Sequence, residues 1–167
     1  MKTLLLIRHA KSSWDNAILN DRDRPLNDRG KRDAPEMARR LISNGVVIDR
    51  FISSPARRAR KTAELFIKEY GRKEEEILFI PELYHPDIGN FNDVIATLDD
   101  TYNHVAIFSH NPGITAFINT LDSVHLDNMP TCGVFAVSSR AASWSVFLKT
   151  PKDFLFFDYP KALPPLI

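Results

Sequence analysis

The sequence predicts an α/β protein, a three-layer α/β/α sandwich with a mainly parallel central sheet. The first observation behind this prediction is that apolar runs of strand length alternate with amphipathic helical patterns along most of the chain. The second is that three of these runs end directly in polar residues, namely Arg8-His9, Ser53-Ser54 and Ser109-His110. Ligands of open α/β sheets bind at the carboxyl ends of the strands, so we expect these side chains to meet at one rim.

The first part of the chain predicts one strand and one helix. Leu4–Ile7 read as a buried strand, and residues 12–26 are polar and rich in turn formers. Asn27 is a suitable N-cap for a helix that runs towards Asn44. Pro35 should kink this helix or delay its start, and Gly45 is a good stop.

The central part repeats the pattern. Val46–Ile52 read as a second strand, followed by a helix whose apolar stripe spans Ala59 to Tyr70 and which Gly71 ends. Ile77–Ile80 are expected to form a short strand, and residues 81–90, "PELYHPDIGN", a loop before a helix over Phe91–Leu98.

The last part predicts a strand, a helix and an antiparallel region. The expected elements are a strand over Val105–Phe108, a helix over about Ile114–Leu121, an antiparallel strand pair of Val134–Val137 with Trp144–Leu148, and an edge strand over Phe154–Tyr159. The tail "PKALPPLI", residues 160–167, is expected to have little regular structure.

Length and composition indicate an ordinary globular protein. The 167 residues are expected to form one domain, residues 1–167, with 44% hydrophobic and 26% charged residues. The formal net charge is +1, so no general attraction to nucleic acid or to a membrane surface is implied. An anion site must therefore be local.

The cysteine content and the apolar runs bear on the cell compartment. Cys132 is the single cysteine, which excludes an internal disulfide and a thiolate zinc cage and favours a reducing compartment. The N-terminal apolar run is too short for a signal peptide, and no segment approaches the length of a membrane span. We therefore expect a cytoplasmic protein.

Two histidines in matching positions are the strongest chemical signal. One histidine after a strand is most often structural, but His9 and His110 follow two different strands, and Arg8 adjoins the first. Metal binding is the rival interpretation, yet no H-x-x-x-H spacing is present and no carboxylate except Asp15 is near either histidine in sequence. Arginine suits a phosphate, because its planar fork matches two phosphate oxygens.

The stretch "SSPARRARKTAE", residues 53–64, supports an anion site. Arg57 and Arg58 lie about 100° apart on a helix, so they cannot both face one pocket equally. Arginine at a helix N-terminus is unfavourable with the helix dipole unless an anion is bound there.

Taken together, "RHAKSSW", "RPLNDRG", "SSPARRARKTAE" and "SHNPG" resemble the histidine phosphatase superfamily, also called the phosphoglycerate mutase-like family. Within it the chain is most similar to the SixA-type phosphohistidine phosphatases. The resemblance covers roughly residues 3 to 138 and implies a phosphoglycerate mutase-like fold. It also implies a hydrolase that uses a histidine nucleophile and a phosphohistidine intermediate, with no metal and no organic cofactor.

The resemblance assigns roles residue by residue. His9 matches the nucleophile, and Arg8 and Arg58 match the two phosphate-binding arginines. His110 matches the second histidine, which binds phosphate and steadies the transferring group. Ser12 falls where many members contact phosphate with a serine.

The sequence departs from the family pattern in three places. Ala10 replaces the commoner glycine, and Asp15 lies where many members carry asparagine. The proton donor of the ester-cleaving members has no clear counterpart. Glu82 is the nearest candidate and Asp87 another, but the motif around them does not match.

These features favour dephosphorylation of phosphohistidine in proteins, so the expected partner is a phosphate-bearing substrate, such as a phosphohistidine protein. A small-molecule phosphomonoesterase that uses Glu82, Asp15 or Asp87 as its acid is the first alternative. A phospho-ligand-binding domain without catalysis is the second, and the oligomeric state stays open. The other histidines are expected to be structural or surface residues: His85, His104 and His125.

Overall fold

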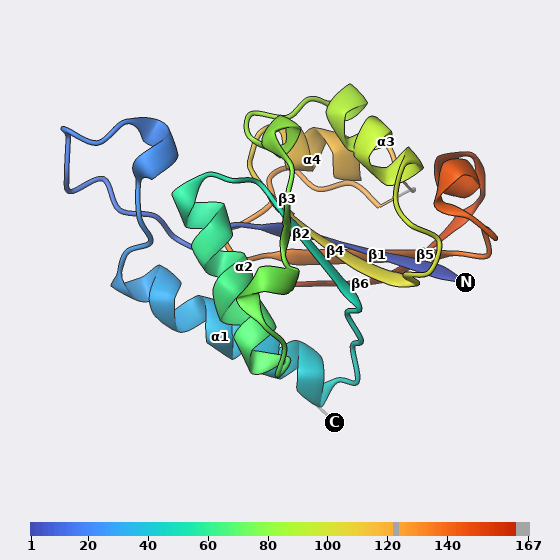
Figure 1. The fold of residues 1–167 in the computed structure, drawn as a ribbon, viewed down its shortest axis with the longest axis horizontal. Coiled ribbons are helices and arrows are strands. Elements are labelled where there is room, and N and C mark those ends of the chain that lie inside the picture. Colours follow the sequence, from blue (N-terminus) through green and yellow to red (C-terminus); the bar gives the residue numbers. More distant parts are fainter. Residues whose placement is uncertain (122–123, 163–167) are drawn as a thin grey trace.

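A computed structural model of the chain describes residues 1–121 and 124–162 (Figure 1). Its centre is a six-stranded sheet with the strand order β3-β2-β4-β1-β5-β6. The strands are β1 (Lys2–Arg8), β2 (Arg50–Ser53), β3 (Leu78–Phe79), β4 (His104–Ser109), β5 (Val134–Ser139) and β6 (Lys152–Asp158).

The sheet is mostly parallel. β3, β2, β4 and β1 pair in parallel, whereas β5 runs antiparallel to both β1 and β6. β5 is therefore the one reversed strand of this sheet, which confirms the predicted mainly parallel arrangement.

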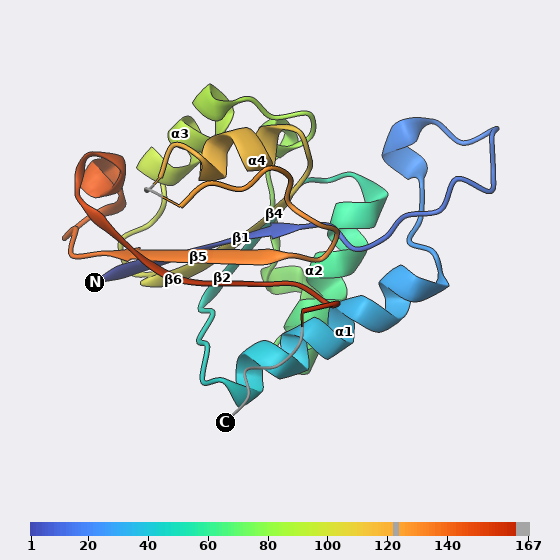
Figure 2. The ribbon, with the colours of Figure 1, turned by 180° about the vertical axis from the view of Figure 1, so that it is seen from behind.

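Helices cover both faces of the sheet and complete the three layers. α1 (Asp28–Ser43) and α2 (Arg57–Glu69) pack on one face. α3 (Ile88–Ala96), α4 (Gly113–Ile118) and the 3₁₀ helix η4 (Trp144–Lys149) lie on the other, as Figures 1 and 2 show. Three short 3₁₀ turns complete the set, η1 (Asp21–Asp23), η2 (Glu74–Glu76) and η3 (Pro81–Leu83).

The residues of β1 divide between two hydrophobic cores. Leu5 and Ile7 belong to the core under α1 and α2, and Leu4 and Leu6 belong to the core under α3 and α4. All four side chains are fully buried, because successive residues of a strand point to opposite faces and both faces are covered. This explains the unbroken apolar run before Arg8.

Local signals set the bounds of α1. The side chain of Asn27 accepts a hydrogen bond from the backbone N–H of Gly30 and caps the helix start. Gly45 follows the C-cap with φ +76°, a conformation that glycine adopts without strain. Pro35 lies inside α1 and does not delay its start.

The predicted strand over Trp144–Leu148 is wrong. This segment forms η4, and the strand that pairs with β5 is β6. Trp144 is buried, its ring N–H donates to the carbonyl of Tyr102 and its backbone N–H to the carboxylate of Asp100. These hydrogen bonds hold the segment against the loop before β4, so it cannot pair with β5.

Other bounds differ by a few residues. β2 begins at Arg50 instead of Val46, and α3 begins at Ile88, where the side chain of Asp87 accepts the N–H of Asn90. The end of the predicted tail, residues 163–167, lies outside the described residues. Within residues 1–121 and 124–162, no helix is both long and apolar enough to cross a membrane.

Candidate active site

The parallel register brings three strand ends to one edge of the sheet. Arg8 at the end of β1 pairs with Ser109 of β4, and Ser53 at the end of β2 pairs with Phe108. The backbone N–H of His9 donates to the carbonyl of Ser109. The residues that follow each strand therefore meet, as the sequence predicts.

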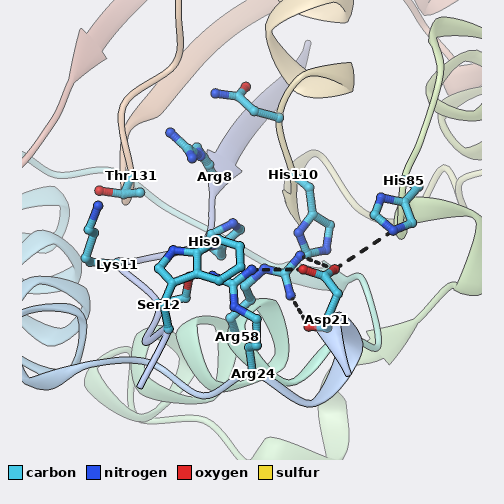
Figure 3. A pocket seen from close by; sticks show the side chains of 12 residues that line it. Arg8, His9, Lys11, Ser12, Asp21, Arg24, Arg58, His85, His110 and Thr131 are labelled. Carbon is cyan, nitrogen blue, oxygen red and sulfur yellow. Dashed lines mark hydrogen bonds and ion pairs between the residues drawn. The ribbon is translucent and has the colours of Figure 1, made fainter. Parts of the chain in front are cut away.

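A cavity of about 270 Å³ opens at this edge (Figure 3). The rings of His9 and His110 lie side by side there, with their centroids 5.1 Å apart. The residues that line the cavity are Arg8, His9, Lys11, Ser12, Trp14, Asp21, Arg24, Arg58, His85, His110, Asn111 and Thr131.

His9 is fixed in one tautomer. Its Nδ1 lies 2.7 Å from the carbonyl oxygen of Ala10, and because a carbonyl only accepts, Nδ1 carries the proton. Burial, the largest effect, together with Arg58, Arg8 and Arg24, lowers the pKa of His9 to about 3, against the opposing effect of the Ala10 bond. The ring is therefore neutral near pH 7, with a lone pair on Nε2.

His110 is held from the other side of the cavity. Its Nε2 lies 2.7 Å from the hydroxyl oxygen of Ser54, which follows β2. Burial and then the neighbouring His9, Arg58 and His85 lower the pKa of His110 to about 2. Its Nδ1 is buried and has no hydrogen-bond partner.

Arg8 shows the same incomplete bonding. Its Nη1 donates to the carbonyl of Met129, in the loop before β5, while its buried Nε has no partner. Among the described residues, Nε of Arg8 and Nδ1 of His110 are the buried side-chain nitrogens or oxygens that lack a partner. Such groups each cost about 1–3 kcal/mol, and both belong to residues that line this cavity, which indicates a site shaped for a ligand.

Arg58 is oriented by Asp21. Its Nη1 donates to the backbone carbonyl of Asp21 at 2.6 Å, and its Nη2 to the carboxylate at 3.0 Å. Partial burial raises the pKa of Asp21, but hydrogen bonds from Tyr84, Arg58 and Arg24 outweigh it and hold the pKa well below its usual range. Asp21 is therefore ionised. It accepts one N–H from each terminal nitrogen of Arg58, and the remaining N–H groups of Arg58 can donate to a ligand.

Ser12 and Arg24 lie next to each other in the lining of the cavity. Arg24 donates from Nη2 to the hydroxyl of Ser12 and from Nη1 to Asp21, and its guanidinium lies 3.2 Å from the centroid of the Trp14 ring. Trp14 also lines the cavity and is 74% exposed. It serves as a cover over Arg24 at the mouth of the cavity.

The structure separates the two adjacent arginines, as their helical spacing predicts. Arg58 lines the cavity of the two histidines, and Arg57 lines a different one. His9, Arg8, Arg58, His110 and Ser12 all lie together in the first cavity.

The candidate acids do not join this set. Glu82 lines a separate cavity with Asn90 and Asp93, Asp87 caps α3, and Asp15 is exposed. The position of Glu82 gives its predicted role as proton donor no support.

Several residues that line the cavity are not among the predicted site residues: Lys11, Asp21, Arg24, His85, Asn111 and Thr131. His85 is the clearest correction, since it lines the cavity with its Nε2 3.9 Å from the carboxylate of Asp21. Its backbone φ is +52°, a conformation uncommon for any residue but glycine and found at functional sites. Arg24 could have been found from "RPLNDRG", but no signal marks Asp21.

The described part of the chain contains no ready-made set of metal ligands. No group of three or more His, Cys, Asp or Glu side chains there is placed to hold a metal ion. The groups that converge are instead nitrogen donors and cations, which suit an oxyanion.

Fold and site together define an α/β protein with a cavity lined by paired histidines and arginines at the carboxyl edge of its parallel strands. Residues 4–98 match the model of the histidine phosphatase superfamily, branch 1. The chain belongs to this superfamily.

Relatives in sequence agree with this membership. The chain is 40% identical over 153 residues to an uncharacterised chloroplastic protein of Arabidopsis thaliana, a match that covers 86% of this chain and 69% of that protein. It is 31% identical over 96 residues to the 2,3-bisphosphoglycerate-dependent phosphoglycerate mutase of Bradyrhizobium diazoefficiens. That second match covers 54% of this chain and 46% of the mutase.

Solved structures share the fold. The protein histidine phosphatase SixA in complex with tungstate is similar with a TM-score of 0.80 and 22% identity, over 95% of this chain and 97% of that one. The candidate phosphohistidine phosphatase SixA of Agrobacterium tumefaciens has a TM-score of 0.79 and 23% identity, over 95% and 98% of the two chains.

Proposed function

We propose that this protein is a phosphatase that removes the phosphoryl group from phosphohistidine in proteins, with His9 as the nucleophile. The observation that carries the proposal is the pair of buried, neutral histidine rings 5.1 Å apart in a cavity lined by Arg8 and Arg58. Membership of the histidine phosphatase superfamily supports it. A cytoplasmic location and a single domain over residues 1–167 stay predictions.

The first step is attack on phosphorus by His9. Nε2 of His9 forms a bond to phosphorus while the bond from phosphorus to the leaving nitrogen breaks, and the electron pair of that bond departs with the leaving imidazole. Phosphoryl transfer depends mainly on positioning and on neutralising charge at the phosphoryl oxygens. Arg8, Arg58 and His110 would supply the donors, and Ser12 a further contact.

The second step releases phosphate. A water oxygen bonds to phosphorus, the bond to Nε2 of His9 breaks and its electron pair returns to the ring. Both protons of the water leave with the inorganic phosphate, as H₂PO₄⁻ or as HPO₄²⁻ and a proton released to solvent. Nδ1 keeps its proton and its bond to Ala10 in both steps, so the tautomer of the ring does not change.

The acid chemistry of the cavity favours phosphohistidine over a phosphoester. Asp21 is the carboxylate that lines the cavity in the described chain, and its lowered pKa keeps it ionised, so it is a poor proton donor. An alkoxide leaves slowly without a donor, since positioned proton transfer contributes about 10²–10⁴-fold. A phosphorylated imidazole that carries a proton on its other nitrogen leaves as a neutral ring and needs no such donor.

The test compares two substrate classes and traps the intermediate. We expect the enzyme to hydrolyse a phosphohistidine peptide at least about a hundredfold faster, in kcat/KM, than phosphoserine or p-nitrophenyl phosphate. Acid-labile, base-stable label from a phosphohistidine substrate should appear on His9. His9→Ala should lose the label and about a thousandfold or more of the activity.

His104→Ala is the matched control, because His104 opens β4 at the opposite end from His110 and does not line the cavity. It should keep both label and activity. Preferred turnover of phosphoesters would contradict the proposed substrate, and phosphohistidine binding without turnover would indicate a silent binding domain instead.

A further inference from the structure

A second cavity, of about 370 Å³, lies beside the active site and has no role in the proposed chemistry. Three arginines, one carboxylate and one aromatic ring dominate its lining, which consists of Arg22, Asp23, Pro55, Arg57, Arg60 and Phe79. We call it the arginine cavity.

The two cavities share the same two structural elements. In η1, Asp21 lines the active-site cavity, whereas Arg22 and Asp23 line the arginine cavity. In the first turn of α2, Arg58 lines the former and Arg57 the latter. A ligand with its phosphoryl group beside His9 therefore needs to cross only the η1 turn to reach the second set of arginines.

The arginine cavity carries net positive charge, because three arginines and one aspartate line it. Arg22 and Arg60 are exposed, and in the described part of the chain neither forms an ion pair within 4.0 Å. The guanidinium of Arg57 donates to the backbone carbonyl of Asp23, which holds η1 against α2 but leaves its charge unpaired. The protein as a whole has a net charge of only +1, so this concentration is local.

An apolar edge adjoins these charges. Phe79, which lines the arginine cavity, is 38% exposed and lies on β3, the edge strand of the sheet. An exposed aromatic ring on an edge strand offers apolar contact area to a partner chain. Arginine and aromatic residues together are enriched where proteins bind one another.

We propose that the arginine cavity and Phe79 bind an acidic segment of the protein that carries the phosphohistidine. The inference rests on the proposed function and adds the class of partner to it. Acidic side chains of the partner face Arg22, Arg57 and Arg60, while its apolar residues cover Phe79. Docking there places the phosphorylated ring at the neighbouring cavity.

The lining favours a protein over other anions. A compact phosphate group calls for converging, well-oriented donors, but Arg22 and Arg60 are exposed side chains on different elements. A nucleic acid carries a charge on every phosphate and would place one beside Asp23, whereas a peptide can place an apolar or neutral residue there. Carboxylates interspersed with apolar residues match a mixed lining of this kind.

The experiment uses three substrates. The first is a phosphohistidine peptide flanked by glutamates, the second is the same peptide with glutamines in their place, and the third is free phosphohistidine. We expect the wild-type protein to prefer the acidic peptide over the neutral one by about tenfold in kcat/KM at low salt, with the preference shrinking as salt screens the charges.

Charge reversal then tests the surface. In Arg22→Glu/Arg60→Glu, kcat/KM on the acidic peptide should fall by about tenfold or more, while turnover of free phosphohistidine stays unchanged. The control is Arg140→Glu/Lys149→Glu, which reverses two exposed cations that line neither cavity, one after β5 and one in η4, and should keep the preference.

The outcomes separate the two proposals. No hydrolysis of any phosphohistidine substrate by the wild-type protein overturns the proposed function and the docking surface with it. Hydrolysis with no preference for the acidic peptide, or an equal loss in the control variant, overturns the docking surface alone. Displacement of the acidic peptide by a DNA oligonucleotide of equal charge at lower concentration would also overturn it, in favour of a nucleic acid partner.

Discussion

Each of the two site histidines is held at one ring nitrogen, but by partners at very different distances along the chain. His9 donates to Ala10, its own neighbour, so its orientation is set within the turn after β1. His110 depends on Ser54, 56 residues away, so its orientation exists only once β2 and β4 have paired. The orientation of His110 is therefore more sensitive than that of His9 to substitutions elsewhere in the chain.

We predict that Ser54→Ala lowers kcat by about tenfold, because His110 loses the group that orients it towards the phosphoryl oxygens. Ser53→Ala is the matched control: its hydroxyl donates to the carbonyl of Ser54, whereas the hydrogen-bond partner of His110 is the hydroxyl of Ser54. Phosphohistidine turnover measures the effect, and the ¹⁵N chemical shifts of His110 should change in the first variant but not in the second. Equal activity of both variants would show that Ser54 has no positioning role.

At the residue scale, the sequence reveals side chains that follow strands and hides those that come from loops. His9, Arg8 and His110 could be predicted because an apolar run ends beside each of them. Asp21 lies in a polar stretch with no periodicity, and only the folded chain brings it to Arg58. Its bond from Tyr84, 63 residues away, has no counterpart in local sequence.

At the scale of elements, Thr62 joins α2 to the turn that bears the nucleophile. Its hydroxyl accepts the backbone N–H of Ala10 and donates to the carbonyl of Arg58, and the side chain is fully buried. One side chain thus ties the position of His9 to the helix turn that carries Arg58.

We predict that Thr62→Val, which keeps the shape and removes the hydroxyl, lowers the free energy of unfolding by about 1–3 kcal/mol, because the buried N–H of Ala10 loses its partner. Urea denaturation measures the loss, and kcat should fall as well because the turn at His9 loosens. Thr62→Ser keeps the hydroxyl and should retain most of the activity. An unchanged unfolding midpoint in the valine variant would contradict the link.

The element predictions succeed where burial on both faces sets the pattern and fail where a long-range contact competes. β1 and β4 are covered on both sides, so their apolar runs identify them as strands. Trp144–Leu148 has a similar apolar content, but the bonds from Trp144 to Asp100 and Tyr102 draw it into η4. No local pattern contains that information.

At the scale of the whole molecule, two buried neutral histidines make stability depend on pH. The pKa values of His9 and His110 in the folded protein are about 3 and about 2, below the ordinary value of 6.5. At pH values between these lowered pKa values and 6.5, the two histidines bind protons in the unfolded chain but not in the folded chain. Stability is therefore complete above about pH 6.5 and falls as the pH decreases, with a slope of about 1.4 kcal/mol per pH unit for each histidine.

We predict that the free energy of unfolding is roughly 2–4 kcal/mol lower at pH 5 than at pH 7.5 because of these two groups. Urea denaturation at the two pH values measures the difference. The double variant His9→Gln/His110→Gln removes both groups and should lose markedly less over the same interval. Parallel pH curves for the two proteins would be inconsistent with neutral burial of the rings.

The reversed direction of β5 has an effect on the whole molecule. A further parallel strand would place its C-terminal end at the rim, but β5 is antiparallel and places its N-terminal end there. The loop before β5 therefore brings backbone carbonyl and N–H groups to the rim. The backbone carbonyl of Met129 accepts a hydrogen bond from the guanidinium of Arg8, and the backbone N–H of Cys132 donates to the carbonyls of Arg8 and His9. One corner of the pocket is consequently held by main-chain groups, so replacement of Thr131, the residue of this segment that lines the pocket, can change what enters it without removing those backbone bonds.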